Sequence, residues 1–369
     1  MRKIGVPELD DIALGAALLG AGGGGDPYVG KLMAMNAIDE CGEVSLISPD
    51  EVPDDALILP VAMMGAPTVL CEKAANGDEF IRLYEMLKQF YGRDFYAVVP
   101  WEAGGVNSML PFVAATRLGV PMVDADGMGR AFPELQMVTF SIGGISATPL
   151  GFTDEKGNSA ILNTIDNKWT EDIARAMTMV CGGSVSIAFY IMTGKELKEF
   201  AIPDIVTYSQ TLGRVIRTAK NVTGMTPEEY FLKEASGHKL FTGKISDVLR
   251  EVKGGFNFGK VEILGIGEYK GNDATVEFQN ENLIAKVNGK VKAVTPDLIC
   301  IVDAETFVPV PTDALKYGKR VTVVGLECHH LWRRPEGIEL VGPRYFGYDV
   351  DYEPVEILAK KNDDKEESK

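Results

Sequence analysis

The sequence contains few of the residues from which metal sites and nucleophilic triads are commonly built. It has only three histidines and five cysteines among 369 residues. Three histidines leave little material for a His-rich metalloenzyme or a Ser-His-Asp triad. The cysteines are scattered, odd in number and free of any C-x-x-C pair, which speaks against a disulfide framework and a structural zinc knuckle.

Positive charge and long apolar runs are also in short supply. The chain carries 37 Lys and Arg against 53 Asp and Glu, a net charge of −16. This balance argues against nucleic acid and anionic membrane as partners, because both require clustered basic side chains. No window approaches 18 uninterrupted apolar residues, and the opening MRKIGVPELDD lacks the apolar core of a signal peptide. We therefore expect a cytoplasmic protein without a membrane span.

The first half of the chain alternates between two hydrophobic patterns. Apolar runs of strand length lie at 44–47, 56–62 and 95–100, and stretches with helical spacing lie at 8–20, 77–91 and 107–118. Such alternation is typical of a parallel sheet covered by helices.

The pattern changes after residue 151. Helical spacing recurs at 169–181 and 206–218, and from residue 241 short apolar runs are separated by Gly, Asn, Asp and Pro. Asn288-Gly289 lies between two such runs and has the preferred chemistry of a two-residue hairpin turn. Regular short strands of this kind indicate a small barrel or sandwich.

These patterns predict an α/β protein of two domains. We expect residues 1–168 to form an N-terminal domain with a mainly parallel sheet covered by helices. Residues 169–358 should form a C-terminal domain with a small β-barrel as its core, at about 240–330. The charged tail at 359–369 has no apolar anchor and should be disordered.

The segment VPMVDADGMGRAFPELQ, residues 120–136, concentrates ionisable side chains where a strand is expected to end. A short apolar run breaks into Asp124 and Asp126, followed by Arg130 and Glu134. In an open α/β sheet, ligands bind beyond the carboxyl ends of the strands, and ionisable groups at such an edge are costly as mere core. The alternative is a salt-bridged loop that braces an interface.

A second polar segment, WEAGGVNS, follows the strand FYAVVP. It places Glu102 at another carboxyl edge and Asn107 near the start of the next helix. If Glu102 met Asp124 and Asp126 in one crevice, the cluster would either bind a divalent cation or share protons, raising one pKa for acid–base work. Alternatively, Glu102 accepts hydrogen bonds from loop amides.

The loop GAGGGGDP formally satisfies G-x-G-x-x-G, but the dinucleotide fingerprint requires a preceding strand and a helix is expected here. Its Gly23, Gly24 and Gly25 could present backbone amides to an anion or carboxylate. The alternative is a tight connection that needs positive φ values. Asp26 is interpreted as a helix cap. Met64, after the strand ALILPVA, would line the same crevice or pack in the core.

Two further candidates are weaker. Cys71 lies at an expected helix start, where a thiolate could be activated, although a small buried hydrophobe is the commoner role. Cys328, His329 and His330 look like a metal cluster, but adjacent residues on a strand point to opposite faces. That geometry disfavours one ion held by both histidines.

Six segments together resemble the S-methyl-thiohydantoin desulfurase family, which is related to genes for hydantoinase and oxoprolinase. They are GAGGGGDPYVG, VAMMGAPTV, EAGGVNS, VDADGMGRAFPELQM, ISATPL and GPRYFGYDVDYEPVE, spread over roughly residues 8 to 356. The resemblance implies an N-terminal α/β domain and a C-terminal domain with a β-barrel. It also implies hydrolysis of a five-membered thiohydantoin or hydantoin-like ring, which a metal ion could assist. The chain departs from the family's pattern at Cys71 and at His329-His330, which argues against functional roles there.

We therefore expect a hydrolase that acts on a cyclic amide or thioamide and releases a thiol or sulfide. The chemistry needs a base for water, a proton donor for sulfur and a group that offsets developing negative charge. Asp126 and Glu102 are the candidates for the base or for ligands of a divalent metal ion, with Asp124 in support. Arg130 would pair a substrate carboxylate, and Glu134 would instead lock Arg130 in place.

The remaining expectations concern binding and partners. Asn107, Met64 and Gly23 to Gly25 would bind the substrate, and a homo-oligomer would complete the crevice from a neighbouring copy. An alternative of another class is a non-catalytic subunit of an ATP-dependent hydantoinase or oxoprolinase-type assembly, although no long exposed apolar strip announces a partner. A metal-dependent amidohydrolase unrelated to sulfur would use the same site.

Overall fold

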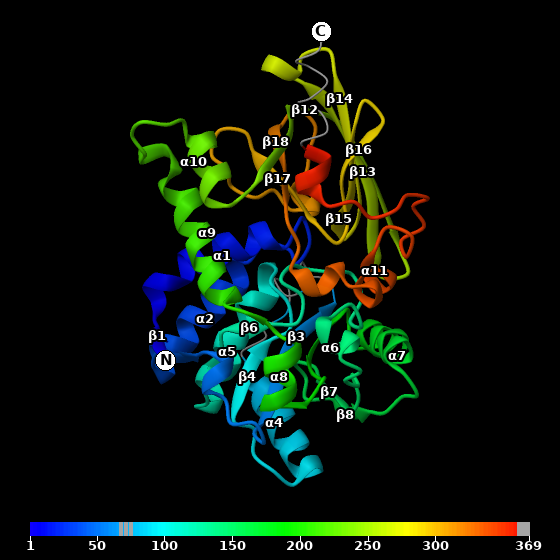
Figure 1. The fold of residues 1–369 in the computed structure, drawn as a ribbon. Helices are drawn as coiled ribbons and strands as arrows, with labels where there is room; N and C mark the ends of the chain where they lie inside the picture. Colours follow the sequence, from blue (N-terminus) through cyan, green and yellow to red (C-terminus); the bar gives the residue numbers. More distant parts are fainter. Residues whose placement is uncertain (66–68, 70–72, 74–76, 360–369) are drawn as a thin grey trace.

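The computed structural model describes residues 1–65, 69, 73 and 77–359; Cys71 lies outside the described residues. Its first sheet has nine strands and forms the lower half of the molecule in Figure 1. The strands are β1 (Arg2–Ile4), β2 (Val44–Ile47), β3 (Leu57–Gly65), β4 (Ala97–Pro100), β5 (Met122–Val123), β7 (Leu150–Thr153), β8 (Ser159–Leu162), β9 (Ser184–Ala188) and β10 (Met192–Thr193). A two-residue strand, β6 (Ala125–Asp126), pairs separately with β11 (Ile202–Pro203).

This sheet is mixed, so the expectation of a mainly parallel sheet is only partly confirmed. The strand order is β1-β2-β5-β4-β3-β9-β7-β8, and only the central β2, β5, β4 and β3 run parallel. β9 runs antiparallel to β3, and β7 and β8 form a hairpin through the turn at DEKGN. An apolar run predicts a buried strand but does not encode its direction, and a turn this short joins only antiparallel strands.

The helices are α1 (Val6–Leu19), α2 (Tyr28–Cys41), α4 (Asp78–Tyr91), α5 (Leu110–Leu118), α6 (Thr139–Ile142), α7 (Asn167–Val180), α8 (Gly194–Phe200), α9 (Ile205–Thr218), α10 (Pro227–Glu234) and α11 (Pro335–Val341). Most of them pack around the first sheet, whereas α10 lies beside the second sheet in Figure 1. Within the described residues, no helix is both long and apolar enough to cross a membrane.

Helices α1 and α9 pack closely against each other through glycine. A β-carbon on Gly15 would lie 1.8 Å from the carbonyl oxygen of Ser209, and one on Gly213 would lie 1.8 Å from that of Asp11. The two glycines therefore let the helix backbones touch. As a result, α9, which comes from the second half of the chain, packs as part of the first layer.

The second sheet contains seven antiparallel strands in the order β16-β15-β14-β13-β12-β18-β17. They are β12 (His238–Lys253), β13 (Phe256–Gly265), β14 (Asp273–Gln279), β15 (Glu281–Val287), β16 (Lys290–Val294), β17 (Leu298–Asp303) and β18 (Arg320–Leu326). The turn predicted at Asn288-Gly289 is confirmed, with φ values of 47° and 75° and Val287 paired to Lys290.

The expected barrel is a curled half-barrel. Its concave face encloses a separate apolar core that includes Phe241, Ile263, Val276 and Ile301. Among the described residues no ladder of hydrogen bonds joins the edge strands β16 and β17, so the sheet curls without closing. Regular strands and turns predict curvature, whereas closure depends on strand tilt and stagger, which the turn spacing does not determine.

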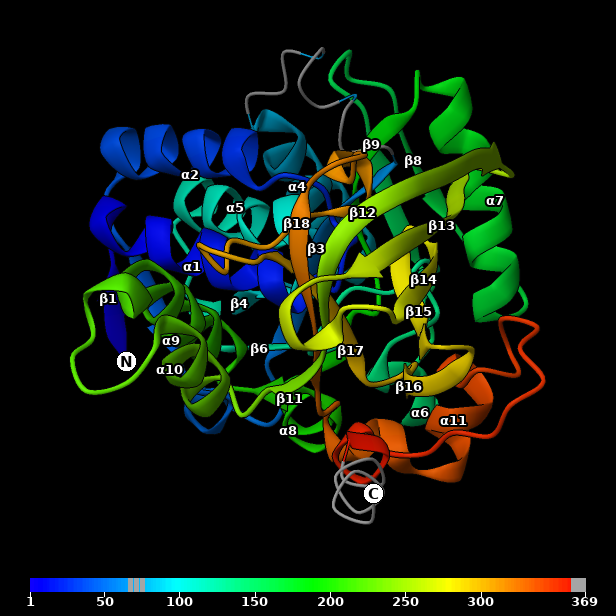
Figure 2. The ribbon, with the colours of Figure 1, turned by 90° about the horizontal axis from the view of Figure 1, so that it is seen from above.

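The two sheets meet along a junction that is built on Arg130. This side chain is fully buried and donates hydrogen bonds to the carbonyl oxygens of Pro296 and Asp297, both at 2.8 Å. Its guanidinium carbon lies 4.4 Å from the centre of the Phe132 ring. Figure 2 shows the long β12–β13 hairpin reaching from this junction across the first layer toward α7.

Candidate functional site

A cavity of about 490 Å³ lies at the junction between the two sheets. The first layer contributes the loop Gly22–Gly25, the end of β3 and residues 101–107, and α7 contributes Glu171 and Arg175. The second sheet contributes the tip of the β12–β13 hairpin and Glu281. Cavities of this size, mostly apolar and lined by a few polar groups, are the usual form of a small-molecule site.

Glu102 follows β4 and is 5% exposed in the wall of this cavity. Its Oε1 accepts a hydrogen bond from Asn107 Nδ2 at 2.7 Å. Burial raises the pKa of Glu102 to about 7, although the Asn107 amide and the Phe132 backbone N–H favour the ionised form. Glu102 therefore lines the cavity and also accepts local hydrogen bonds, as both interpretations of the sequence suggested.

Asn107 holds Glu102 in place. Its Oδ1 accepts from the Met63 N–H at 2.8 Å, and its Nδ2 donates both to the Met63 carbonyl oxygen and to Glu102. Both amide protons are thus used inside the protein. The geometry makes Asn107 a positioning residue that ties the end of β3 to the carboxylate.

Glu281 is a second cavity carboxyl, which the sequence analysis did not single out. It begins β15 and is 3% exposed. Burial raises its pKa well above the usual range, and the negative charge of Glu102 raises it further. Among the described residues, Oε2 of Glu281 has no hydrogen-bond partner. A charged residue at the start of a buried strand, in the segment QNENLIA, was the available signal.

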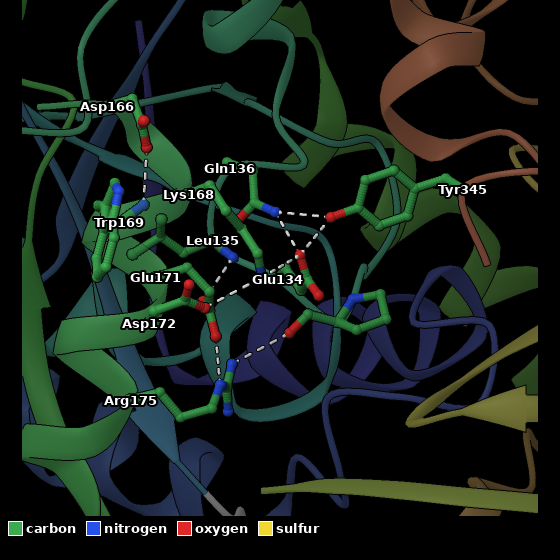
Figure 3. A network of polar contacts seen from close by, with 11 residues as sticks. Glu134, Leu135, Gln136, Asp166, Lys168, Trp169, Glu171, Asp172, Arg175 and Tyr345 are labelled. Atoms are coloured by element: carbon green, nitrogen blue, oxygen red, sulfur yellow. Dashed lines mark hydrogen bonds and ion pairs between the residues drawn. The ribbon is translucent and has the colours of Figure 1, made fainter. Parts of the chain in front are cut away.

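The α7 side of the cavity rim is held by an ion pair, shown in Figure 3. Arg175 Nε bonds Glu171 Oε1, and Glu171 Oε2 accepts from the Leu135 N–H at 2.9 Å. The guanidinium carbon of Arg175 lies 4.2 Å from the centre of the Phe256 ring, which belongs to the hairpin tip. α7 therefore fixes both the loop at 133–135 and the hairpin that covers the cavity.

Asp126 lies near Glu102 but does not line the cavity. It is fully buried, and both of its carboxyl oxygens lie 2.9 Å from the Gly129 N–H. Burial raises the pKa of Asp126 well above the usual range, and the charge of Glu102 adds to this effect. We expected Asp126 and Glu102 to meet in one hollow, and this expectation is wrong for Asp126. Asp126 instead organises the loop behind the cavity.

Asp124 caps α9. Its Oδ1 accepts from the backbone N–H groups of Val206 at 2.8 Å and Thr207 at 3.1 Å, and its Oδ2 bonds the Thr207 hydroxyl. The first turn of a helix leaves such N–H groups unpaired, so a carboxylate there stabilises the helix start. Asp124 does not line the cavity.

Arg130 and Glu134 are also engaged away from the cavity. Arg130 binds carbonyl oxygens of the second sheet, so the expected pairing with a substrate carboxylate is not what the geometry provides. Glu134 does not hold Arg130: it bonds the Tyr345 hydroxyl at 2.6 Å, Gln136 and Lys168 (Figure 3). The acidic loop thus braces neighbouring elements, which was the alternative interpretation of this segment.

The glycine run forms a tight connection and also lines the cavity. Gly22, Gly24 and Gly25 have φ values of 95°, 73° and 69°, which confirms the interpretation based on positive φ. The Gly24 carbonyl oxygen accepts from the Val106 N–H at 3.0 Å. Gly23, Gly24, Gly25 and Met64 all line the cavity. Binding of a ligand by these residues stays a prediction.

The histidine pair is arranged differently from the expectation. β18 ends at Leu326 and a 3₁₀ turn begins at His330, so the strand geometry assumed for His329 and His330 is wrong; their ring centres lie 4.1 Å apart. Burial lowers the pKa of His329 to about 4. Within the part of the chain that the structure describes, no group of three or more His, Cys, Asp and Glu is placed to hold a metal ion.

Comparison with known proteins agrees with this two-part architecture. The model of the S-Me-THD-like N-terminal domain matches residues 7–164, and that of the S-Me-THD-like C-terminal domain matches residues 165–355. An X-ray crystal structure of a protein from Chromobacterium violaceum superposes with a TM-score of 0.79 at 22% identity. The alignment covers 96% of this chain and 100% of the other, and it shows a shared fold. No curated protein matches the chain.

Proposed function

The chain belongs to the S-Me-THD-like family, and we propose that it is a hydrolase acting on a five-membered cyclic thioamide. Its substrate would be a thiohydantoin or its S-methyl derivative, and its products a hydantoin and a thiol or sulfide. The observation that supports this most directly is the pair Glu102 and Glu281 in one cavity wall. One carboxyl comes from each half of the protein.

Burial raises the pKa of both carboxyl groups, to about 7 for Glu102 and well above the usual range for Glu281. Glu102 accepts hydrogen bonds from Asn107 and Phe132, which stabilise its ionised form. Glu281 has an unpartnered Oε2 among the described residues and lies within the field of Glu102, and both its burial and that field favour its protonated form. Carboxyl pairs with separated pKa values commonly divide the roles of base and acid. We assign the base to Glu102 and the acid to Glu281.

The reaction on the S-methyl form consumes one water. Glu102 accepts a proton as the water oxygen bonds to the ring carbon that bears sulfur, and the C=N electron pair moves to nitrogen. Glu102 passes this proton to the ring nitrogen, the C–S bond breaks with its electron pair on sulfur, and Glu281 protonates the departing sulfur. The O–H electron pair of the new hydroxyl group forms the C=O bond, and its proton restores Glu281. In the balance, the water oxygen becomes the ring carbonyl oxygen, and its two protons end on the ring nitrogen and the thiol.

The test is to incubate the purified full-length protein with S-methyl-thiohydantoin and to measure released methanethiol and hydantoin. In ¹⁸O-labelled water, the label should appear in the new ring carbonyl. Ring-opened product from plain hydantoin, without thiol release from either sulfur ring, would contradict the desulfurase assignment and favour an amidohydrolase. Elemental analysis of the same preparation measures whether a divalent metal ion accompanies the activity.

The same assay addresses the alternative of a non-catalytic subunit. If thiol release requires a co-purifying ATP-dependent partner and is absent from the chain alone, the proposed assignment of catalysis to Glu102 and Glu281 is contradicted. Size-exclusion chromatography with light scattering would measure whether the active species is the homo-oligomer that we expect.

A further inference from the structure

Trp101 lies in the cavity wall beside the carboxyl pair. It follows β4 directly, is 6% exposed, and its ring packs 5.2 Å from that of Phe189 at an interplanar angle of 56°. Its carbonyl oxygen accepts from the Gly127 N–H at 3.0 Å, so the backbone is fixed. In contrast, its indole Nε1–H is buried and has no hydrogen-bond partner among the described residues.

A second buried tryptophan in the same junction provides an internal comparison. Trp332 is fully buried, and its Nε1 donates to the Met128 carbonyl oxygen at 2.7 Å. At Trp332 the indole N–H is therefore satisfied within the protein itself. Leaving a buried donor unpaired is unfavourable, and native proteins leave few such groups.

The unpaired donor of Trp101 and the unpaired Oε2 of Glu281 belong to residues that line one cavity and are not bonded to each other. We infer that the indole N–H of Trp101 is reserved for the ligand and donates to a carbonyl oxygen of the bound ring. This inference rests on the proposed function and identifies which part of the ring the site recognises. It makes Trp101 a specificity-determining residue.

The chemistry of the indole narrows the substrate class. An indole N–H is a donor only, so its partner must be an acceptor, and neutral sulfur accepts hydrogen bonds more weakly than oxygen. The preferred ring therefore carries sulfur at the reacting carbon and oxygen at the other. A ring with sulfur at both carbons would leave the donor poorly paired. Sites built around a buried hydrogen bond discriminate strongly against ligands that lack the matching group.

The experiment compares the binding of hydantoin and 4-thiohydantoin by calorimetric titration. The two rings differ in one atom, because 4-thiohydantoin has sulfur in place of the carbonyl oxygen at the carbon that does not react. We expect the wild-type protein to bind hydantoin at least about tenfold more tightly, because about 1.4 kcal/mol corresponds to a factor of ten. Trp101→Phe should bind both rings alike. Trp332→Phe, which removes the structural indole, is the matched control and should keep the wild-type preference.

Replacement of Trp101 by benzothienylalanine guards against a packing defect, because it exchanges the N–H for sulfur in an almost unchanged shape. It should abolish the preference as Trp101→Phe does. Equal affinity of the wild-type protein for the two rings, or a preference that survives both replacements, would overturn the inference. Because binding is measured without turnover, a preference in a protein that releases no thiol would contradict only the proposed hydrolysis.

Discussion

The Glu281 side chain lies directly against the Cα of Gly23. A β-carbon on residue 23 would come within 1.9 Å of Glu281 Oε1 and 2.4 Å of its Cδ. Gly23 was expected to contact the substrate through its backbone, and the structure gives it an additional role. It leaves the space in which the carboxyl group from the opposite sheet reaches the cavity.

Substitution of Gly23 by Ala should therefore impair catalysis through Glu281. The added methyl group cannot coexist with the present carboxyl position, so we expect kcat to fall at least about tenfold, equivalent to a misplacement cost of about 1.4 kcal/mol. The alkaline limb of the pH profile should move as well, which a general packing defect would not cause. Gly5→Ala, whose nearest neighbour is the flexible end of Glu43 at 3.2 Å, is the control. The shorter side chain of Glu281→Asp should make the Gly23→Ala loss smaller in the double variant; equal losses would count against this contact.

Glu102 should give the reaction its acidic limb. The base must be ionised, and burial raises the pKa of Glu102 to about 7, so activity should decline as the pH falls through about 7. The pH dependence of kcat/KM reports the pKa values of the free enzyme, so this acidic limb should appear in kcat/KM. Glu102→Gln should lower kcat/KM by about 10²–10⁴-fold, the usual contribution of a general base. A profile that stays flat down to pH 5 in the wild-type protein would exclude Glu102 as the base.

The rate loss caused by removing the Glu281 carboxyl group should depend on how strongly the leaving group requires protonation. Glu281→Gln should slow release of methanethiol by about 10²-fold or more. With an S-trifluoroethyl substrate, whose thiol is more acidic, the loss should be much smaller, because that sulfur departs without a proton. Glu262→Gln, an exposed carboxylate paired with Lys260 in the same sheet, is the matched control. An equal loss on both substrates would mean that Glu281 is not the acid.

Asp124 should affect stability rather than chemistry. Asp124→Ala leaves the N–H groups of Val206 and Thr207 without their acceptor, and we expect it to lower the free energy of unfolding by about 1–3 kcal/mol. Denaturant unfolding measures the change. Asp10→Ala, which removes an exposed ion pair to Lys31, should cost less than about 1 kcal/mol. If Asp124→Ala instead keeps full stability and loses turnover, the capping role is wrong.

Local chemistry predicted most of the elements. The helices expected at 169–181 and 206–218 form as α7 and α9, and the Asn288-Gly289 turn has the expected positive φ values. These features depend on neighbours in the chain, so the sequence displays them. The direction of β9 and the open edge of the second sheet depend on distant pairings and were therefore not predicted.

Only one of the two cavity carboxyl groups was predicted from the sequence, and the reason is the same. Glu102 followed a recognisable strand and was identified, whereas Glu281 lies 179 positions later and looks, on its own, like the polar start of an ordinary strand. Asp126 was overrated because proximity to a strand end does not reveal which face a side chain takes. The backbone amide of Gly129 decides this by binding both oxygens of Asp126 behind the cavity wall.

Within the described part of the chain, the hydrogen bonds of Arg130 to the other half of the molecule go to main-chain oxygens, those of Asn282, Pro296 and Asp297. Every amino acid supplies a main-chain oxygen. These hydrogen bonds therefore require a particular path of the chain but no particular side chains along it. Substitutions in the partner segment that preserve its chain path should therefore leave these hydrogen bonds intact. The junction requires the Arg130 side chain in one half of the molecule and the path of the loop backbone in the other.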